Sequence, residues 1–308
     1  VNQIIRYSSN IGAAKVGQAL GSQRFYDYLL RFGFGSRPGV TALSGGSGIL
    51  HPAQSWSDID LAAISFGQAI GVTALQMAKA YLCLANMGEA KPLRLVLDPA
   101  PEAPEAGGRV VNEKAAQAVL SMMREVVEMD GTGKKARIPG VPVAGKTGTA
   151  QKAGKGGYSD ERLSSFVGLI PGDNPEFLVL ALVDEPKTIS YGGVVAAPAV
   201  KDIASRALAY YGRLPDAPEE AEETRPDPDP SSMTAQVLPA GQPRTPGEMV
   251  PDLSGLPLRR AVELLVQKGI VPVVKGRGMV VSGQKPAAGE PWPEGREGKD
   301  DVFVLILS

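Results

Sequence analysis

Hydrophobic residues recur at intervals of three and four along much of residues 1–211, which is the spacing of helices that bury one face. A break near Gly71 separates two of these helices, and Thr73 is expected to cap the second. Ser22 is likewise expected to cap the helix that follows it. The predicted helices span residues 1–7, 11–20, 23–31, two parts of 61–87, 112–127 and 197–211.

Continuous apolar runs rich in β-favouring residues indicate strands instead. The runs at 163–170 and 177–183 are bounded by Gly, Asp and Pro, and a further strand is expected at 91–97. The Gly- and Lys-rich segment 152–161 is expected to form a loop over the mouth of a cleft. The pattern predicts an α/β fold of the α+β type, with an antiparallel sheet flanked by helices.

The stretch from Val143 to Gln151 begins with small apolar residues and then turns polar at Lys146. We expect Lys146 on an edge strand of the sheet, with its side chain facing the cleft. Gly145 and Gly148 carry no side chain, so they are expected to let a substrate backbone lie close to this strand.

Composition changes sharply after residue 212. Residues 213–246 are dominated by Pro, Glu, Asp and Ser and are expected to form a semi-extended linker. Regular patterns return at 247–308, with a helix at 258–268 and strands at 271–274 and 301–307. The predicted organisation is a first domain at 1–212, a linker and a small second domain.

Charge and rare residues exclude several classes of function. The formal net charge is −1, so no basic excess favours nucleic acid. Cys83 is the single cysteine, which rules out an intrachain disulfide, and it lies in an apolar helical run, where a core position is expected. His51 is the single histidine, in a predicted loop, so neither a Ser-His-Asp hydrolase nor a metal centre is expected. No cofactor is expected.

Two short motifs far apart in the sequence point to one chemistry. Ser8-Ser9-Asn10 has the form S-x-N, and Lys146-Thr147-Gly148 has the form K-T-G. The two motifs occur together in penicillin-binding proteins and class A β-lactamases. The chain resembles the class B penicillin-binding proteins, and most closely their division-specific, septal branch. The resemblance extends over residues 1–212 through 8–12, 32–35, 131–133, 145–151, 165–168 and 191–198.

The resemblance implies a penicillin-binding transpeptidase fold of the serine β-lactamase-like kind. Residues 247–308 resemble a PASTA domain, a small β-α-β-β module, in a single copy. The family places its nucleophile and base in an S-x-x-K motif before S-x-N, and residues 1–212 contain no S-x-x-K. Ser282-Gly283-Gln284-Lys285 matches the pattern but lies in the PASTA-like unit, so we interpret it as a match without a catalytic role. The nucleophile, part of the sheet and a membrane anchor are therefore expected before Val1.

The resemblance also implies roles for the residues that are present. Ser8 is expected to relay a proton between base and leaving amine, and Asn10 to bind the substrate amide and orient the absent lysine. Lys146 is expected to place a cation beside Ser8 and the substrate carboxylate. Thr147 and Thr149 are expected to offer hydroxyls to that carboxylate, with the Thr149 N–H as half of the oxyanion hole. Gly148 is expected to permit close passage of the substrate.

The function implied is D,D-transpeptidation of peptidoglycan during septal wall synthesis, inhibited by β-lactams. Two alternatives stay open: a D,D-carboxypeptidase or β-lactamase-like hydrolase, and a non-catalytic wall-binding or divisome scaffold piece. The implied partners are the D-alanyl-D-alanine stem peptide, β-lactams, and a division glycosyltransferase with other divisome proteins. The implied location is the plasma membrane, with the catalytic domain on its outer face. The sequence leaves open whether the role is septal, elongation or sporulation.

Overall fold

The computed structural model divides into two compact units, Val1–Ala217 and Pro218–Ser308. It describes residues 1–40, 45–94, 107–154, 157–187, 189–215, 249–268, 270, 272–276, 280–292 and 303–307. Most of the predicted linker lies outside these residues. Among the residues described, no helix is both long and apolar enough to cross a bilayer.

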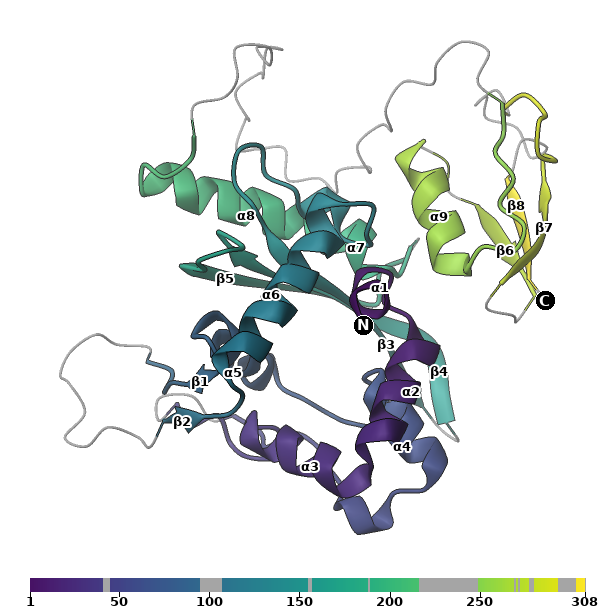
Figure 1. Cartoon of the computed structure of the whole chain (residues 1–308). Coiled ribbons are helices and arrows are strands. Elements are labelled where there is room, and N and C mark those ends of the chain that lie inside the picture. The colour runs from purple at the N-terminus through teal and green to yellow at the C-terminus, as the bar shows by residue number, and fades with distance from the viewer. Residues whose placement is uncertain are drawn as a thin grey trace. The chain divides into compact units, whose positions relative to one another are not determined.

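The first unit surrounds a three-stranded antiparallel sheet of order β3-β4-β5 (Figure 1). Helices make up most of the other regular structure of this unit, and two strands, β1 and β2, form a separate ribbon. The strands are β1 Glu89–Ala90, β2 Gly108–Arg109, β3 Ala144–Gly154, β4 Gly157–Ile170 and β5 Phe177–Asp184. The helices are α1 Asn2–Arg6, α2 Asn10–Leu20, α3 Ser22–Arg31, α4 Asp58–Ser65, α5 Ala74–Ala85, α6 Glu113–Glu128, α7 Gly192–Val195 and α8 Ala197–Tyr210, with short 3-10 turns at Ala53–Ser55 and Lys134–Ala136.

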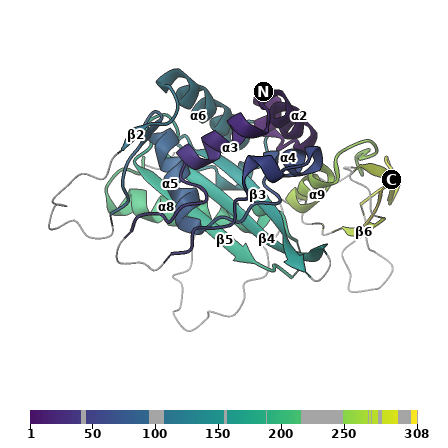
Figure 2. The same cartoon turned by 90° about the horizontal axis from the view of Figure 1, so that it is seen from below.

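Both faces of the sheet are buried. Neighbouring residues of β4 alternate between them: Phe166 packs in a core with α8, and Val167 in a second core with α5 and α6. In Figure 1, α8 lies on one side of the sheet and α5 on the other, and Figure 2 shows the sheet from below with α3, α4 and α5 in front of it. This arrangement explains the continuous apolar runs in β4 and β5, because strands covered on both sides need no polar face.

The predicted strands at 163–170 and 177–183 are confirmed, as is the edge position of the strand that carries Lys146. The predicted loop at 152–161 is wrong for residues 152–154, which belong to β3, and for residues 157–161, which belong to β4; residues 155–156 lie outside the described residues. Ala153 pairs with Tyr158 there, and Ser159 Oγ donates to the Lys152 carbonyl. The cross-strand pairing therefore overrides the weak strand preference of Gly and Lys.

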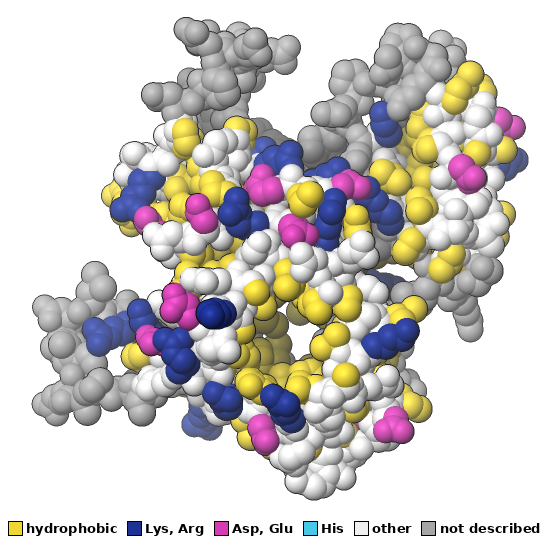
Figure 3. Space-filling view, in the orientation of Figure 1, with side chains coloured by type: hydrophobic (Ala, Val, Ile, Leu, Met, Phe, Trp, Pro, Cys, Tyr) yellow, Lys and Arg dark blue, Asp and Glu magenta, His cyan; other side chains and the backbone are white. Residues whose placement is uncertain are grey.

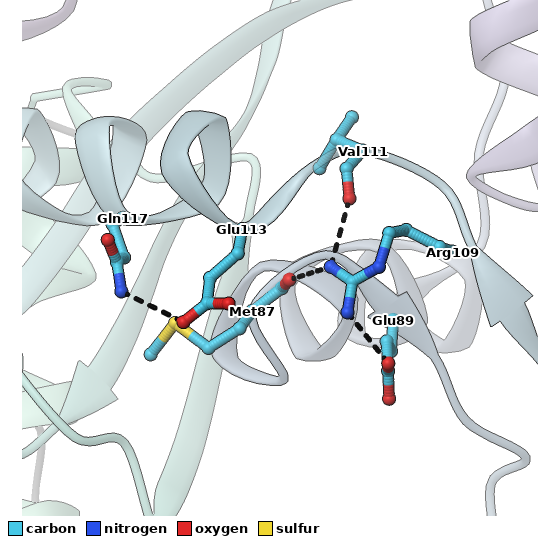
Figure 4. Close-up of polar contacts among 6 residues, drawn as sticks. All are labelled: Met87, Glu89, Arg109, Val111, Glu113 and Gln117. Atoms are coloured by element: carbon cyan, nitrogen blue, oxygen red, sulfur yellow. Dashed lines mark hydrogen bonds and ion pairs between the residues drawn. The ribbon is translucent and has the colours of Figure 1, made fainter.

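The predicted strand at 91–97 is also wrong where it can be tested. Residues 91–94 lie outside any strand, and 95–97 lie outside the described residues. The strand ends at Ala90, and Arg109 on β2 holds this ribbon together. Its guanidinium donates to the Met87 carbonyl at 2.8 Å and to the Val111 carbonyl at 3.5 Å, and it pairs with Glu89 at 2.8 Å (Figure 4).

The helix predictions hold, with one cap corrected. Thr73 caps α5 as expected, accepting from the Gln76 N–H in a reciprocal capping box. Ser22 is the first helical residue of α3 rather than its cap, and Gly21 takes the cap position with a φ of 80°. Glycine adopts that left-handed value without steric cost, whereas serine does not. Cys83 is buried, as predicted, and burial raises the pKa of its thiol.

The second unit is a small sheet with one helix. Its strands are ordered β6-β8-β7, with β6 parallel and β7 antiparallel to β8. In place of a leading strand, the described residues show an isolated bridge between Met249 and Pro291. The elements are α9 Leu258–Gln267, β6 Val273–Lys275, β7 Val281–Lys285 and β8 Val304–Leu307. Ser282 lies within β7, and its hydroxyl donates to the Ile306 carbonyl, which fits a structural role for this residue.

Candidate active site

Ser8 lies in a tight connection between α1 and α2. Its φ is +54°, in the left-handed region that costs a residue with a side chain about 1–2 kcal/mol. The next residue, Ser9, caps α2: its hydroxyl accepts from the Gly12 N–H at 3.2 Å. Because Ser9 satisfies the helix end, the Ser8 hydroxyl is available for another contact.

That contact is with Lys146. The Lys146 ammonium donates to Ser8 Oγ at 2.6 Å, although 138 positions separate the two residues in the sequence. The ammonium also donates to the Thr147 carbonyl at 3.0 Å and to Thr147 Oγ1 at 3.4 Å. The predicted contact between the S-x-N and K-T-G motifs is therefore confirmed.

The two threonines of the K-T-G strand have internal partners. Thr147 is buried, and its Oγ1 lies 3.1 Å from Thr132 Oγ1. Thr149 Oγ1 accepts from the Gly192 N–H at 3.3 Å. The strand that is predicted to bind substrate is thus tied to α7 and to the turn after α6.

Asn10 is the first residue of α2, two positions after Ser8, and its side chain is exposed. It is therefore on the surface near the Ser8–Lys146 contact. The serine lies before the helix and the asparagine within it, with the capping Ser9 between them. All three residues of the S-x-N motif consequently have different local environments.

The glycine directly before Lys146 is required by the protein's own packing. A Cβ on Gly145 would lie 2.5 Å from the Phe166 ring, and a Cβ on Gly148 would lie 2.3 Å from Ser165 Oγ. For Gly145, the expectation that the missing side chain makes room for substrate is wrong, because the freed space is filled by the buried phenyl ring. At Gly148 the neighbouring hydroxyl can rotate away, so packing does not by itself require a glycine there.

The segment that follows Tyr191 packs directly on the K-T-G strand. A Cβ on Gly192 would lie 2.1 Å from the Ser165 carbonyl oxygen and 2.6 Å from that of Gly148. Ser164 Oγ donates to the Ser190 carbonyl at 2.5 Å and fixes the start of this segment. Sequence reasoning missed Ser164, which lies in an apolar run and gives no motif signal.

Thr132 is the second residue that sequence reasoning left without a role. It lies in the turn between α6 and the 3-10 turn at Lys134–Ala136, and its side chain is buried. The signal was present, because Gly131-Thr132-Gly133 is part of the resemblance to the family. A role could not be read from it, since the contacts of Thr132 are made with residues far away in the sequence.

A second lysine on the same strand has a different environment. Lys152 pairs with Asp184 at 2.7 Å and with Glu185 at 2.6 Å, at the far end of the sheet from Ala144. Hydrogen bonds to Asp184 and Glu185 raise the pKa of Lys152. On the turn after α6, burial lowers the pKa of Lys135.

The surface of this unit is hollowed. Figure 3 shows a depression between the regions of α5 and α2, with hydrophobic side chains in it. Large apolar side chains are also exposed on the elements around Ser8, including Tyr7 at 41%, Ile11 at 74% and Val16 at 48%. The elements next to Ser8 thus expose several large apolar side chains.

A serine hydroxyl and a lysine ammonium that meet at the edge of an antiparallel sheet, carried by S-x-N and K-T-G, form a site of the penicillin-recognising type. A family model described as the penicillin binding protein transpeptidase domain matches residues 1–205. The chain belongs to this family. A model described as the PASTA domain matches residues 248–297.

Individual relatives agree with this assignment. The chain is 31% identical over 304 residues to stage V sporulation protein D of Bacillus subtilis, a match that covers 95% of the chain and 44% of that protein. It is 35% identical over 217 residues to the peptidoglycan D,D-transpeptidase FtsI of Escherichia coli, covering 70% of the chain and 36% of FtsI. The chain thus spans less than half the length of these relatives.

Solved structures resemble the first unit. The transpeptidase domain of penicillin-binding protein 3 from Burkholderia pseudomallei matches with a TM-score of 0.65 and 33% identity, covering 70% of this chain and 66% of that one. Penicillin-binding protein 3 of Mycobacterium tuberculosis in complex with aztreonam matches with a TM-score of 0.63 and 35% identity, covering 69% and 51%. These likenesses confirm the predicted fold class.

Proposed function

We propose that this chain contributes the second and third catalytic motifs of a peptidoglycan D,D-transpeptidase that acts in septal wall synthesis. The observation that carries the proposal is the 2.6 Å contact between Lys146 Nζ and Ser8 Oγ. It joins two motifs that lie 138 positions apart in the sequence and on different elements. The name of the E. coli relative supports the reaction class.

The reaction is acyl transfer through a serine ester. A serine oxygen attacks the carbonyl between the two D-alanine residues, and the terminal D-alanine leaves with a proton on its amine. The amine of a second stem peptide then attacks the ester and releases the serine. The nucleophile is proposed to come from a Ser-x-x-Lys segment outside this chain, since residues 1–212 hold none.

In this reaction Ser8 and Lys146 act together. Ser8 Oγ accepts from the ammonium, so its own proton is oriented away from Lys146 and can be passed to the leaving amine. The ammonium donates to the hydroxyls of Ser8 and Thr147 and to the Thr147 carbonyl. Its positive charge is proposed to attract the carboxylate of the substrate.

Asn10 and the Thr149 backbone complete the proposed site. The exposed amide of Asn10 is available to a substrate peptide beside Ser8. Thr149 lies on the same strand as Lys146, and its N–H is proposed as half of the oxyanion hole. Thr147, which is buried, and Gly148 form the part of the strand between Lys146 and Thr149.

The hollow in Figure 3 suggests where the rest of the protein packs. Apolar side chains such as Ile11 and Val16 are exposed on α2, and we propose that the segment carrying the nucleophile covers part of this surface.

The proposed partners are the stem peptide and β-lactams, since a similar protein binds aztreonam, together with the division glycosyltransferase and other divisome proteins. The proposed location is the outer face of the plasma membrane.

The test is labelling by a fluorescent penicillin in the complete protein that contains this chain. Lys146→Ala is expected to slow labelling about 10²- to 10³-fold, the usual loss when one preorganised donor is removed from such a site. Lys152→Ala is the matched control on the same strand and is expected to be labelled like the wild type. Full labelling of Lys146→Ala would refute the proposed role of this residue.

A further inference from the structure

Ser8 and Lys146 belong to elements that have no covalent or secondary-structure link near the site. Ser8 follows α1, and Lys146 lies on the edge strand β3. A contact of 2.6 Å between them requires that something holds the two backbones at a fixed separation. The turn Gly131–Thr132–Gly133 contacts the chain beside Ser8 and the strand that carries Lys146.

Thr132 reaches the serine side through its backbone. Its N–H donates to the Arg6 carbonyl at 3.3 Å, two residues before Ser8. In Figure 1, α1 lies beside α6, from which this turn continues. The position of the Ser8 connection is thus tied to the turn independently of any side chain of the S-x-N motif.

Thr132 reaches the lysine side through its hydroxyl. Thr132 Oγ1 lies 3.1 Å from Thr147 Oγ1, which in turn lies 3.4 Å from Lys146 Nζ. Both threonines are buried, at 6% and 7% exposure, so solvent cannot easily replace this hydrogen bond. The Thr147 hydroxyl is therefore oriented from behind by Thr132 and presents its oxygen to the ammonium.

The turn itself has little freedom to move. The Gly133 N–H donates to the Val126 carbonyl at 2.9 Å, and a Cβ on Gly131 would lie 2.4 Å from the same oxygen. On the other side, a Cβ on Gly193 would lie 2.1 Å from the Thr132 carbonyl oxygen and 3.2 Å from Thr147 Cγ2. Thr132 is consequently clamped between α6 and α7.

We infer that Thr132 is a positioning residue: its hydroxyl and its N–H together set the distance between Ser8 and Lys146. The inference rests on the proposed transpeptidase function. It goes beyond that function in assigning catalytic consequence to a residue that touches neither substrate nor the Ser8 hydroxyl. A purely structural role of Thr132 would affect the stability of the fold without changing the distance between Ser8 and Lys146.

The test compares Thr132→Val, which keeps the shape and the backbone N–H, with Thr132→Ser, which keeps the hydroxyl. Thr132→Val is expected to slow fluorescent-penicillin acylation about tenfold, since it removes one buried hydrogen bond that orients the site. Thr132→Ser is expected to stay within about twofold of the wild type. The matched control is Thr73→Val, which loses the cap of α5 and is expected to lower Tm without slowing acylation.

A crystal structure of Thr132→Val supplies a readout that does not depend on activity. We expect the distance from Lys146 Nζ to Ser8 Oγ to exceed 3.5 Å, about the limit of a hydrogen bond. An unchanged distance, or acylation losses that follow Tm equally in Thr132→Val and Thr73→Val, would overturn the inference. A wild-type protein that is not labelled at all would instead count against the proposed function, and the distance would still decide the role of Thr132.

Discussion

Lys146 and Lys152 lie six positions apart on the same strand, and their surroundings differ in kind. Lys152 pairs with the carboxylates of Asp184 and Glu185, which hold its charge in place and raise its pKa. Lys146 donates to the hydroxyls of Ser8 and Thr147 and to the Thr147 carbonyl. The contacts of Lys152 pair its charge with two opposite charges, whereas these contacts of Lys146 join it to the S-x-N motif.

The comparison gives a physical ground for the different roles proposed for the two lysines. An ion pair with two carboxylates leaves little attraction for a further anion, so Lys152 suits the end of a hairpin. The contacts of Lys146 with Ser8 and Thr147 fix the direction of its ammonium at the point where the two motifs meet. The same distinction applies to Ser8 and Ser9, of which Ser9 caps a helix and Ser8 contacts the lysine.

After Lys146→Ala, the largest effect is expected from Ser8→Ala. Removing the hydroxyl deletes the proposed proton relay, and we expect fluorescent-penicillin labelling to slow about 10²-fold, the lower end of the usual range for general acid–base groups. Ser9→Ala is the matched control, with a loss of about 1 kcal/mol of stability from the helix cap and labelling within about threefold of the wild type. Equal slowing of both variants would mean that the turn as a whole, and not the Ser8 hydroxyl, supports the reaction.

A smaller effect is expected from Gly145→Ala, which tests whether the strand beside Lys146 is shaped by packing. The added methyl would lie 2.5 Å from the buried Phe166 ring, and we expect a loss of about 1–3 kcal/mol in the free energy of unfolding. Gly108→Ala provides the control, because a Cβ there meets no heavy atom within 4 Å. Urea denaturation of the two variants measures the difference. Unchanged stability in Gly145→Ala would restore the view that this glycine serves the substrate.

The sequence predicted the parts of this site that depend on motif and pattern. Two apolar runs, a helix-capping Thr73 and the order of S-x-N and K-T-G were enough to place Lys146 on an edge strand near Ser8. These features are local, or are carried by a specific ordered set of motifs. Periodicity and turn residues therefore sufficed for them.

What the sequence could not predict depends on contacts between distant residues. Beyond a register shift after Gln151, β3 and β4 pair again at Ala153–Tyr158 and Gly154–Gly157, although the Gly and Lys content of 152–161 suggests a loop. The need for Gly145 comes from Phe166, twenty-one positions later in the chain. Thr132 acts through Arg6 and Thr147, and no spacing rule links these three residues.

The smallest effect is expected from Lys152→Met, and it depends on pH. The folded-state pKa of Lys152 is raised above the ordinary value of 10.5 by its two carboxylates, so its contribution to stability is fully present below that value. The contribution is lost as the pH rises through the folded-state pKa, when the ammonium loses its proton. We expect Lys152→Met to lower Tm slightly at pH 8, and the difference from the wild type to shrink with alkaline pH and with added salt, since the pair is partly exposed. Lys201→Met, on an exposed position of α8, serves as the control. A Tm difference that stays constant up to the most alkaline pH would show that the aliphatic stem of Lys152, and not its charge, stabilises the end of the hairpin.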